Sequence, residues 1–336
     1  MNLSFFSIYF YYNKMGVEDL NSIEKHNVKV YDETGATALS CLILQDGKTV
    51  YESYTGTHSR EYGAQKVQED SRFNIASIRK SYIGFALACM IAEGKIRGLD
   101  EDLYAYFPEI PVIEGITIRH VLTHTHGLAE KDGNWIRMFP PGENWFYNNA
   151  GVNLLISLLQ TVSGKTVALI LNEQVFQKAG FSESGWEKSE ENLVVNFLSD
   201  PSRHLDDSGV DSNLYCSTRD LAKWGELFLA RGKNAGILTP DAFNEMTSVQ
   251  FTELPQLPKH GYFWWVKEED FPKNEIGPNV PKGSYQLLGI TGCICLVMPE
   301  YNAVAVRMLN QAWQNRNFDY MDDVRTFGDL AAGMVN

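Results

Sequence analysis

The sequence predicts an α+β fold: an antiparallel sheet built from both chain ends with flanking helices, plus an all-α insertion region. Strand-like segments separated by turn residues lie at residues 37–56 and 261–309. Helical patterns dominate from Ser77 to about residue 250. Because both strand-forming ends share one sheet, the middle of the chain lies beside it as an insertion. A cleft between the two regions is the natural place for a site.

Composition narrows the class of protein. A chain of 336 residues, 44% hydrophobic and 21% charged, is typical of a soluble globular protein with one large domain or two interlocked ones. We assign residues 16–76 and 258–336 to the sheet region and residues 77–257 to the mainly helical region. A net charge of −13 without a basic face argues against nucleic acid as a partner.

Residues 1–15 form an uncertain N-terminal extension. This apolar run is too short to cross a bilayer, so we expect no stable membrane span, and without a basic n-region or a small-residue cleavage site it makes a weak signal peptide. A docking segment and a true start at Met15 both remain open. Five cysteines, an odd number lying mostly in apolar runs, argue against a disulfide framework and favour a reducing, cytoplasmic compartment.

The expected elements follow in chain order. A short helix near residues 16–25 precedes two strands around the turn Gln45–Lys48. The helical segments that follow begin near Ser77, at Thr117, at residue 149, at Ser217 or Thr218, and at Thr239, and three of them stop at Gly127, Gly164 and Gly232. Strands return at residues 261–266 and as a hairpin at residues 287–309, and a helix at residues 319–335 closes the chain.

Ser77 and Lys80 stand before the apolar run "IGFALACMIA". A serine hydroxyl is a poor nucleophile until a base removes its proton. Residues three apart share a helix face, and burial favours the neutral amine that such a base requires. The spacing alone is weak, because Ser22 and Lys25 repeat it in a polar segment, and a capped helix with a surface lysine is the alternative interpretation.

Tyr147 and Asn149 lie two residues apart, just ahead of an amphipathic helix, in "PPGENWFYNNAGVNLL". A phenol and an amide held at a helix start can relay a proton and bind the polar atoms of an acyl substrate. Each also has a structural alternative, because Asn149 can cap the helix and Tyr147 can be a buried aromatic side chain.

In order and spacing, the segments "FNIASIRKS", "ITIRHVLTHTHGL", "PGENWFYNNAGVNLL", "STRDLAKWGELFL" and "GITGCICLVMPEYNAV" resemble the serine β-lactamase and penicillin-binding protein superfamily. The resemblance covers about residues 35–310 and is to the class C-like branch of β-lactamases, D-amino-acid-processing peptidases and esterases. It implies the β-lactamase/transpeptidase fold, with Ser77 as the acylated nucleophile and Lys80 as its basic partner. It further implies that Tyr147 shuttles protons and that Asn149 contacts the substrate.

The family's third motif, a lysine or histidine followed by a small residue and glycine, lies on an edge strand that lines the cleft. It corresponds here to Ile290, Thr291 and Gly292. The resemblance implies that the backbone N–H groups of Ser77 and Cys293 form the oxyanion hole. The motif's cation is absent, because Ile290 stands in its place. Losing its charge-assisted hydrogen bond to a substrate carboxylate costs roughly 1.5–3 kcal/mol, which favours neutral substrates.

We therefore predict a serine hydrolase that acts on small carboxylic esters or amides through an acyl-enzyme on Ser77. A penicillin-binding D-alanyl carboxypeptidase with a peptide substrate, or a weak β-lactamase, is the alternative enzyme. A non-catalytic ligand-binding relative is the third hypothesis. His120 and His124 have zinc-ligand spacing, but no glutamate follows His120, so we expect neither a metal nor an organic cofactor.

Overall fold

The computed structural model describes residues 21–189, 192–197, 206–233, 235–251, 256–269, 274–311 and 318–336. The extension at residues 1–15 and the first half of the helix expected at residues 16–25 lie outside these ranges. Within them, helix α2 (Ser22–Thr34) begins after Asn21, whose side chain accepts a hydrogen bond from the backbone N–H of Glu24. The helix therefore extends nine residues beyond its expected end, to a left-handed Gly35.

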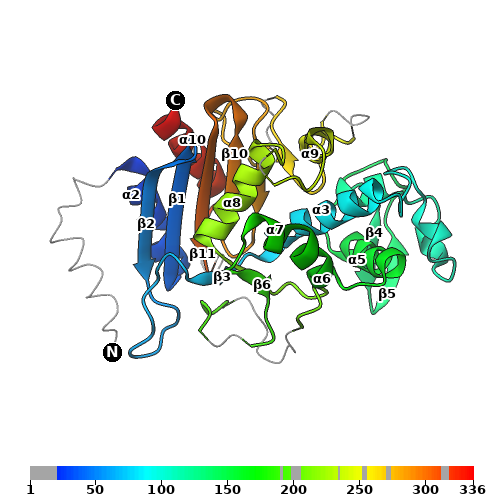
Figure 1. Cartoon of the computed structure of the whole chain (residues 1–336), viewed down its shortest axis with the longest axis horizontal. Helices are drawn as coiled ribbons and strands as arrows, with labels where there is room; N and C mark the ends of the chain where they lie inside the picture. The colour runs from blue at the N-terminus through cyan, green and yellow to red at the C-terminus, as the bar shows by residue number, and fades with distance from the viewer. Residues whose placement is uncertain are drawn as a thin grey trace.

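A six-stranded antiparallel sheet joins the two ends of the chain, which confirms the predicted fold class (Figure 1). Its strand order is β2-β1-β11-β10-β9-β8, so the first strands pair with the last ones. The strands are β1 (Ala38–Gln45), β2 (Lys48–Gly56), β8 (Trp265–Val266), β9 (Tyr285–Leu288), β10 (Ile294–Met298) and β11 (Ala303–Leu309). The division of the chain at residues 76 and 257 stays a prediction.

Helices cover both faces of this sheet. Every residue of β10 and β11 is buried, as expected for strands enclosed between two layers. Leu296 of β10 packs in one cluster with α10 (Tyr320–Val335), whereas its neighbour Val297 packs in the other cluster with α8 (Thr218–Leu229). The alternation of a β-strand thus assigns successive side chains to the two layers.

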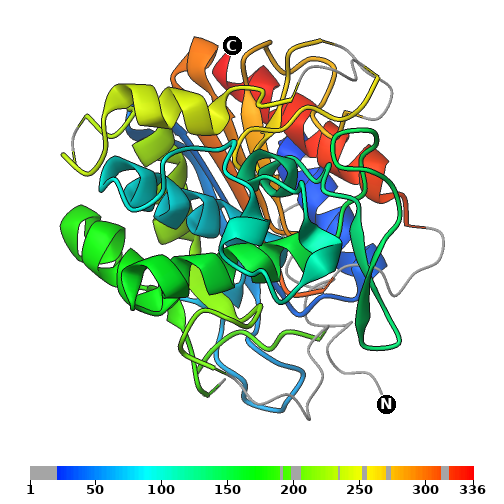
Figure 2. The ribbon, with the colours of Figure 1, turned by 90° about the vertical axis from the view of Figure 1, so that its right-hand side faces the viewer.

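The helices of the middle region lie to one side of the sheet, and the strands are visible behind them in Figure 2. They are α3 (Arg79–Ala92), α4 (Ile118–Leu122), α5 (Ala150–Ser163), α6 (Val167–Leu171), α7 (Gln177–Ala179) and α9 (Pro240–Thr247), with the 3₁₀ turns η2 (Ala76–Ile78), η3 (Leu103–Ala105) and η4 (Pro111–Ile113) and the π-helical segment η5 (Asn172–Phe176). A further 3₁₀ turn, η6 (Pro299–Tyr301), connects the sheet strands β10 and β11. Helix α5 ends at a left-handed Gly164, as predicted. Ser217 rather than Thr218 caps α8, because its side chain accepts from the N–H of Asp220.

The insertion is not purely helical, which corrects the prediction of an all-α region. Strands β3 (Arg72–Asn74), β7 (Leu214–Ser217) and β6 (Ser184–Trp186) form a three-stranded sheet, and β4 (Leu128–Lys131) pairs with β5 (Asn134–Arg137). Strands of three or four residues are too short to show a readable alternation.

Three expected boundaries were also wrong. Helix α4 ends at Leu122 rather than at Gly127, because His124 adopts a left-handed φ of 58°. The strand expected at residues 261–266 is reduced to Trp265–Val266, after a left-handed Phe263. The strand expected from Leu287 is interrupted by a turn between β9 and β10.

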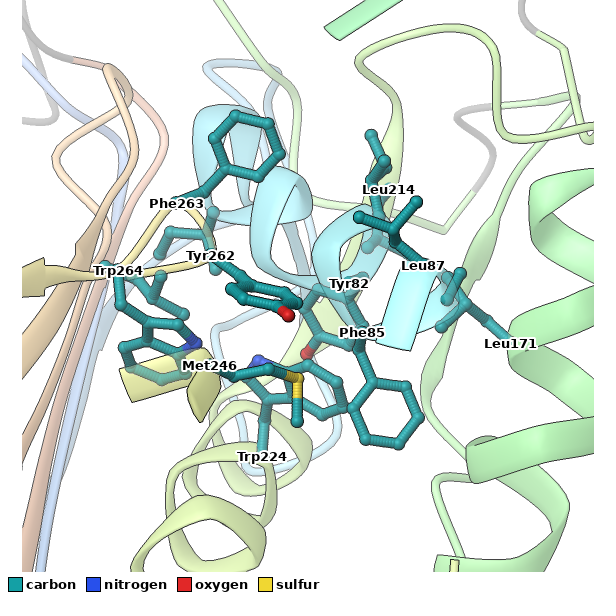
Figure 3. Packing of buried hydrophobic residues seen from close by; sticks show 14 of the residues in the cluster. Tyr82, Phe85, Leu87, Leu171, Leu214, Trp224, Met246, Tyr262, Phe263 and Trp264 are labelled. Atoms are coloured by element: carbon teal, nitrogen blue, oxygen red, sulfur yellow. The ribbon is translucent and has the colours of Figure 1, made fainter. Parts of the chain in front are cut away.

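Helix α3 is the element that ties the helical layer to the sheet layer. Its residues from Arg79 to Met90 are all buried. Tyr82 stacks on Trp224 of α8 with ring centroids 3.9 Å apart, and the indole N–H of Trp224 donates to Ser81 Oγ at 3.0 Å. Figure 3 shows this packing, in which Phe85 also lies against Trp224.

Among the described residues, no single helix has the length and apolar character needed to cross a membrane. The segments Ala150–Ser163 and Val167–Ala179 meet that criterion only as a pair, with a bend of 70° between them.

The Tyr82–Trp224 stack gives a matched stability prediction. Trp224→Ala should lower the free energy of unfolding by about 3–5 kcal/mol, because it opens a cavity between α3 and α8. Tyr82→Phe should change it by less than about 0.5 kcal/mol or raise it, because the Tyr82 hydroxyl is buried with no hydrogen-bond partner among the described residues. Urea unfolding of both variants checks this, and a large loss in Tyr82→Phe would contradict it.

Candidate active site

Ser77 lies in the turn η2, between β3 and α3. The preceding Ala76 has a φ of 47°, a left-handed conformation that is strained for a residue with a Cβ. The side chain of Asn74 holds the kink, because its Oδ1 accepts the Ala76 N–H at 2.8 Å. The chain therefore turns sharply from strand to helix and leaves Ser77 half-buried at the helix start.

Lys80 connects the two predicted catalytic partners. Its Nζ donates a hydrogen bond to Ser77 Oγ at 2.9 Å and another to the Tyr147 hydroxyl at 3.0 Å. Lys80 is only 3% exposed. By contrast, Ser22 and Lys25, which have the same spacing, are both exposed on α2. The structure thus brings together Ser77, Lys80 and Tyr147, and it rejects a surface lysine at position 80.

The protein environment shifts the pKa values of Lys80 and Tyr147 in opposite directions. Burial, with a smaller contribution from the charge of Arg79, lowers the pKa of Lys80 to about 7. Desolvation raises the pKa of Tyr147 to about 12. Tyr147 is 37% exposed as a whole, so the burial that raises its pKa is that of its hydroxyl, which faces Lys80, and the exposed surface belongs to the rest of the side chain. Near neutral pH, Lys80 can accept a proton and Tyr147 can donate one.

Asn148, which the sequence did not single out, holds the loop that carries Tyr147. Its Nδ2 donates to the Leu128 carbonyl at 2.7 Å, and its Oδ1 accepts the Ala150 N–H at 2.8 Å. Asn149 occupies the capping position of α5, but its side chain makes no capping hydrogen bond and is exposed. The alternative interpretation that the Asn149 side chain caps the helix is therefore wrong. Its side-chain amide is left available to a ligand.

Three buried histidines lie next to one another, and one of them, His124, contacts Tyr147. The ring of His124 lies 4.4 Å from the Tyr147 ring, and His260 lies 5.5 Å from His124. Burial lowers the pKa of His126 to about 4 and that of His260 to about 3, and it holds the pKa of His124 well below its usual value. These rings are therefore neutral at physiological pH and add no positive charge to the site.

The zinc spacing of His120 and His124 is not realised on a helix, because α4 ends at Leu122. His120 instead completes a capping box with Thr117, whose N–H donates to His120 Nδ1 at 3.1 Å. Within the described ranges, no group of three or more His, Cys, Asp or Glu side chains has the geometry to hold a metal ion.

The third motif forms a turn rather than part of an edge strand. The N–H of Gly289 donates to the Cys293 carbonyl at 2.8 Å, which closes the connection between β9 and the interior strand β10. Gly292 has a φ of 93°, and a Cβ there would lie 2.9 Å from the Leu309 side chain, so glycine is required. Thr291 is buried, whereas Ile290 is 52% exposed.

This turn is held against the segment that precedes Ser77. Thr291 Oγ1 donates to the Asn74 carbonyl at 3.2 Å, and the backbone of Gly289 lies close to the Ile75 carbonyl. In the part of the chain that the structure describes, the backbone N–H groups of Ser77 and Cys293 have no hydrogen-bond acceptor. Two unused donors in neighbouring segments are the arrangement that an oxyanion requires.

Sequence reasoning missed Asn148, His260 and Glu275. Glu275 has a pKa that burial raises to about 7, and its charge raises the pKa of Tyr147. Neither His260 nor Glu275 lies near a predicted motif in the sequence, so only the folded chain brings His260 to His124 and Glu275 close to Tyr147. Asn148 had a signal, because it stands immediately before the capping position of α5.

Comparisons with known proteins agree on the family and the fold. A family model described as Beta-lactamase matches residues 20–328. An uncharacterized protein of Alkalihalophilus pseudofirmus is 37% identical over 327 residues, which are 94% of this chain and 97% of that protein. An esterase of Burkholderia gladioli is 25% identical over 193 residues, which are 46% of this chain and 48% of the esterase. The solved structure of a class C beta-lactamase matches with a TM-score of 0.73 at 15% identity, covering 92% of this chain and 95% of that one.

The depressed pKa of Lys80 predicts how the reactivity of Ser77 depends on pH. With the neutral amine as the expected base, labelling of Ser77 by a fluorophosphonate should rise about tenfold per pH unit below pH 7 and level off above it. Timed labelling between pH 5 and 9 measures this. A rate that falls as the pH rises through 7 would assign the reaction to the ammonium form instead.

Three variants control this experiment. Because Glu275 also has a pKa of about 7, Glu275→Gln should keep the midpoint if Lys80 is the titrating group. Ser77→Ala should abolish labelling, whereas Ser22→Ala should leave it unchanged because Ser22 is exposed on α2, away from the site.

Proposed function

The chain belongs to the beta-lactamase family, and from this we propose that it is a serine hydrolase that forms an acyl-enzyme on Ser77 and acts on small, uncharged carboxylic esters or amides. The observation that carries the proposal is the amine of Lys80, which is bonded to both Ser77 Oγ and the Tyr147 hydroxyl while its pKa is lowered to about 7. A buried, neutral amine in contact with a serine hydroxyl can act as the base that removes the hydroxyl proton and so activates the serine as a nucleophile.

In the proposed acylation, neutral Lys80 takes the proton of Ser77 as Oγ bonds to the carbonyl carbon of the substrate. The carbonyl oxygen becomes an oxyanion that accepts hydrogen bonds from the N–H groups of Ser77 and Cys293. The Tyr147 phenol then donates its proton to the leaving alkoxide or amine, and the Lys80 ammonium returns a proton to Tyr147. Water, deprotonated by the same residues, hydrolyses the acyl-enzyme in the second half of the cycle.

The charge of the site supports a neutral substrate. Ile290 occupies the place of the family's cation and is half exposed, and the histidines beside Tyr147 are neutral. A substrate carboxylate would therefore find no charged partner at this turn. The similarity to an esterase of Burkholderia gladioli supports the same substrate class.

Pre-steady-state hydrolysis of 4-nitrophenyl butyrate tests the proposal. The wild-type protein should release a burst of nitrophenol equal to the enzyme concentration, and Ser77→Ala should show none, because the acyl-enzyme forms on that hydroxyl. Equal rates without a burst in both proteins would reject the esterase function. Acylation by a labelled penicillin would then favour the peptidase or β-lactamase, and inertness to both reagents would favour a binding protein.

A second experiment tests the role of position 290. Ile290→Lys should shift the ratio of kcat/KM values for the 4-nitrophenyl esters of succinate and butyrate roughly 10- to 100-fold towards the succinate ester, since it restores a charge-assisted hydrogen bond to a carboxylate. Ile290→Met, of similar size and without charge, is the matched control and should leave the ratio unchanged. An unchanged ratio in Ile290→Lys would mean that the turn does not face the acyl group.

A further inference from the structure

Arg307 is a buried cation behind the turn that carries Cys293. It lies on β11 opposite Ile294 of β10, and it is fully buried. Its two terminal nitrogens donate to the two carboxylate oxygens of Asp323 on α10, each at 2.6 Å, and its Nε donates to the Gly292 carbonyl at 3.2 Å. One side chain therefore joins α10 to the turn of the third motif.

Asp323 fixes the direction of the remaining donor. The guanidinium group is rigid and planar, so anchoring both terminal nitrogens on one carboxylate also sets where the Nε–H points. Asp323 is itself buried and is held from α2, because it bonds His26 Nε2 at 2.9 Å. The charge of Arg307 lowers the pKa of Asp323 to about 2, against the effect of burial, so this carboxylate stays ionised across the neutral range.

The hydrogen bond from Arg307 to the Gly292 carbonyl also sets the direction of the next backbone N–H, that of Cys293. The carbonyl of Gly292 and the N–H of Cys293 belong to one trans peptide group, so they point in opposite directions. Holding the carbonyl towards the buried guanidinium turns the N–H away from the core. Glycine at φ 93° gives this peptide little rigidity of its own, so its orientation has to be imposed by neighbouring groups.

We propose that Arg307, held by Asp323, is a positioning residue that orients the Gly292–Cys293 peptide so that the Cys293 N–H faces the oxyanion formed during acylation of Ser77. This inference rests on the proposed function for its catalytic consequence, and on the described contacts for the orientation itself. The cation also polarises the peptide through its carbonyl, which makes the Cys293 N–H a stronger donor.

Arg307→Lys tests the proposal, because a single ammonium keeps a positive charge beside Asp323 but cannot set the direction of a second donor. The burst rate should fall about tenfold or more, since a misdirected oxyanion donor weakens the transition state selectively. KM should change by less than about twofold, and the pH midpoint near 7 should remain because Lys80 is untouched. Asp323→Glu, which displaces the guanidinium, is a second variant with the same expected result.

Val324→Ala is the matched control. Val324 is the next residue of α10 and is fully buried, so the substitution destabilises the same helix without removing a contact of Arg307. It should lower the melting temperature and leave the burst rate within about twofold of wild type. A similar loss of burst rate in Val324→Ala would reduce Arg307 to a structural role and overturn the proposal, as would an Arg307→Lys burst rate within twofold of wild type.

A readout independent of catalysis separates the two proposals. In protein labelled with ¹⁵N-cysteine, the amide resonance of Cys293, assigned from Cys293→Ala, should move in Arg307→Lys, while that of Cys89 on α3 should not. An unmoved Cys293 resonance would overturn the positioning role whether or not the protein hydrolyses esters. If the wild-type protein gives no burst but the Cys293 resonance moves, the proposed function fails and the orienting contact stands.

Discussion

The burial of Lys80 between Ser77 and Tyr147 is the constraint on which the rest of the site depends. An amine on an exposed helix would stay protonated and would hold no advantage over water as a base. The pKa of Lys80 is lowered because α3 is enclosed along its length by the sheet layer and the helical layer, with Tyr82 and Phe85 packed on Trp224. The core that stabilises the fold is therefore also what lowers the pKa of the amine that we propose as the base.

The same logic explains the backbone around the serine. Ser77 lies directly before the buried helix α3 and is nevertheless partly exposed to solvent, which an unbroken helix would not allow. The left-handed Ala76, held by Asn74, provides that break. The carbonyl of Asn74 also accepts a hydrogen bond from the Thr291 hydroxyl, so one residue supports both the proposed nucleophile and the turn opposite it.

The sequence predicted those parts of the structure that depend on local spacing. The interval from Ser77 to Lys80 follows from helical periodicity, and the end of α5 follows from the glycine at position 164. The shared sheet was inferred from strand-like segments at both ends of the chain, although its register was not. The parts it missed depend on contacts between distant segments or on unusual backbone angles. His260 reaches His124 only in the folded chain, and His124 leaves the helix because its φ is positive. Asn148 and Asn149 are chemically identical, so only their geometry could separate the anchor from the free amide.

Arg307 and Lys80 are both buried basic side chains near the site, and they respond to the desolvation of their charge in opposite ways. Arg307 keeps its charge, because guanidinium does not give up its proton and Asp323 supplies a paired carboxylate. Lys80 forms no ion pair with a carboxylate within the described ranges, and its amine can release a proton, so desolvation moves it towards the neutral form. The residue types are not interchangeable, because an anchor needs a permanent charge with fixed donors, whereas a base needs a charge that it can lose. The type of side chain and the presence of a paired carboxylate therefore decide which cation keeps its charge and which one can lose it.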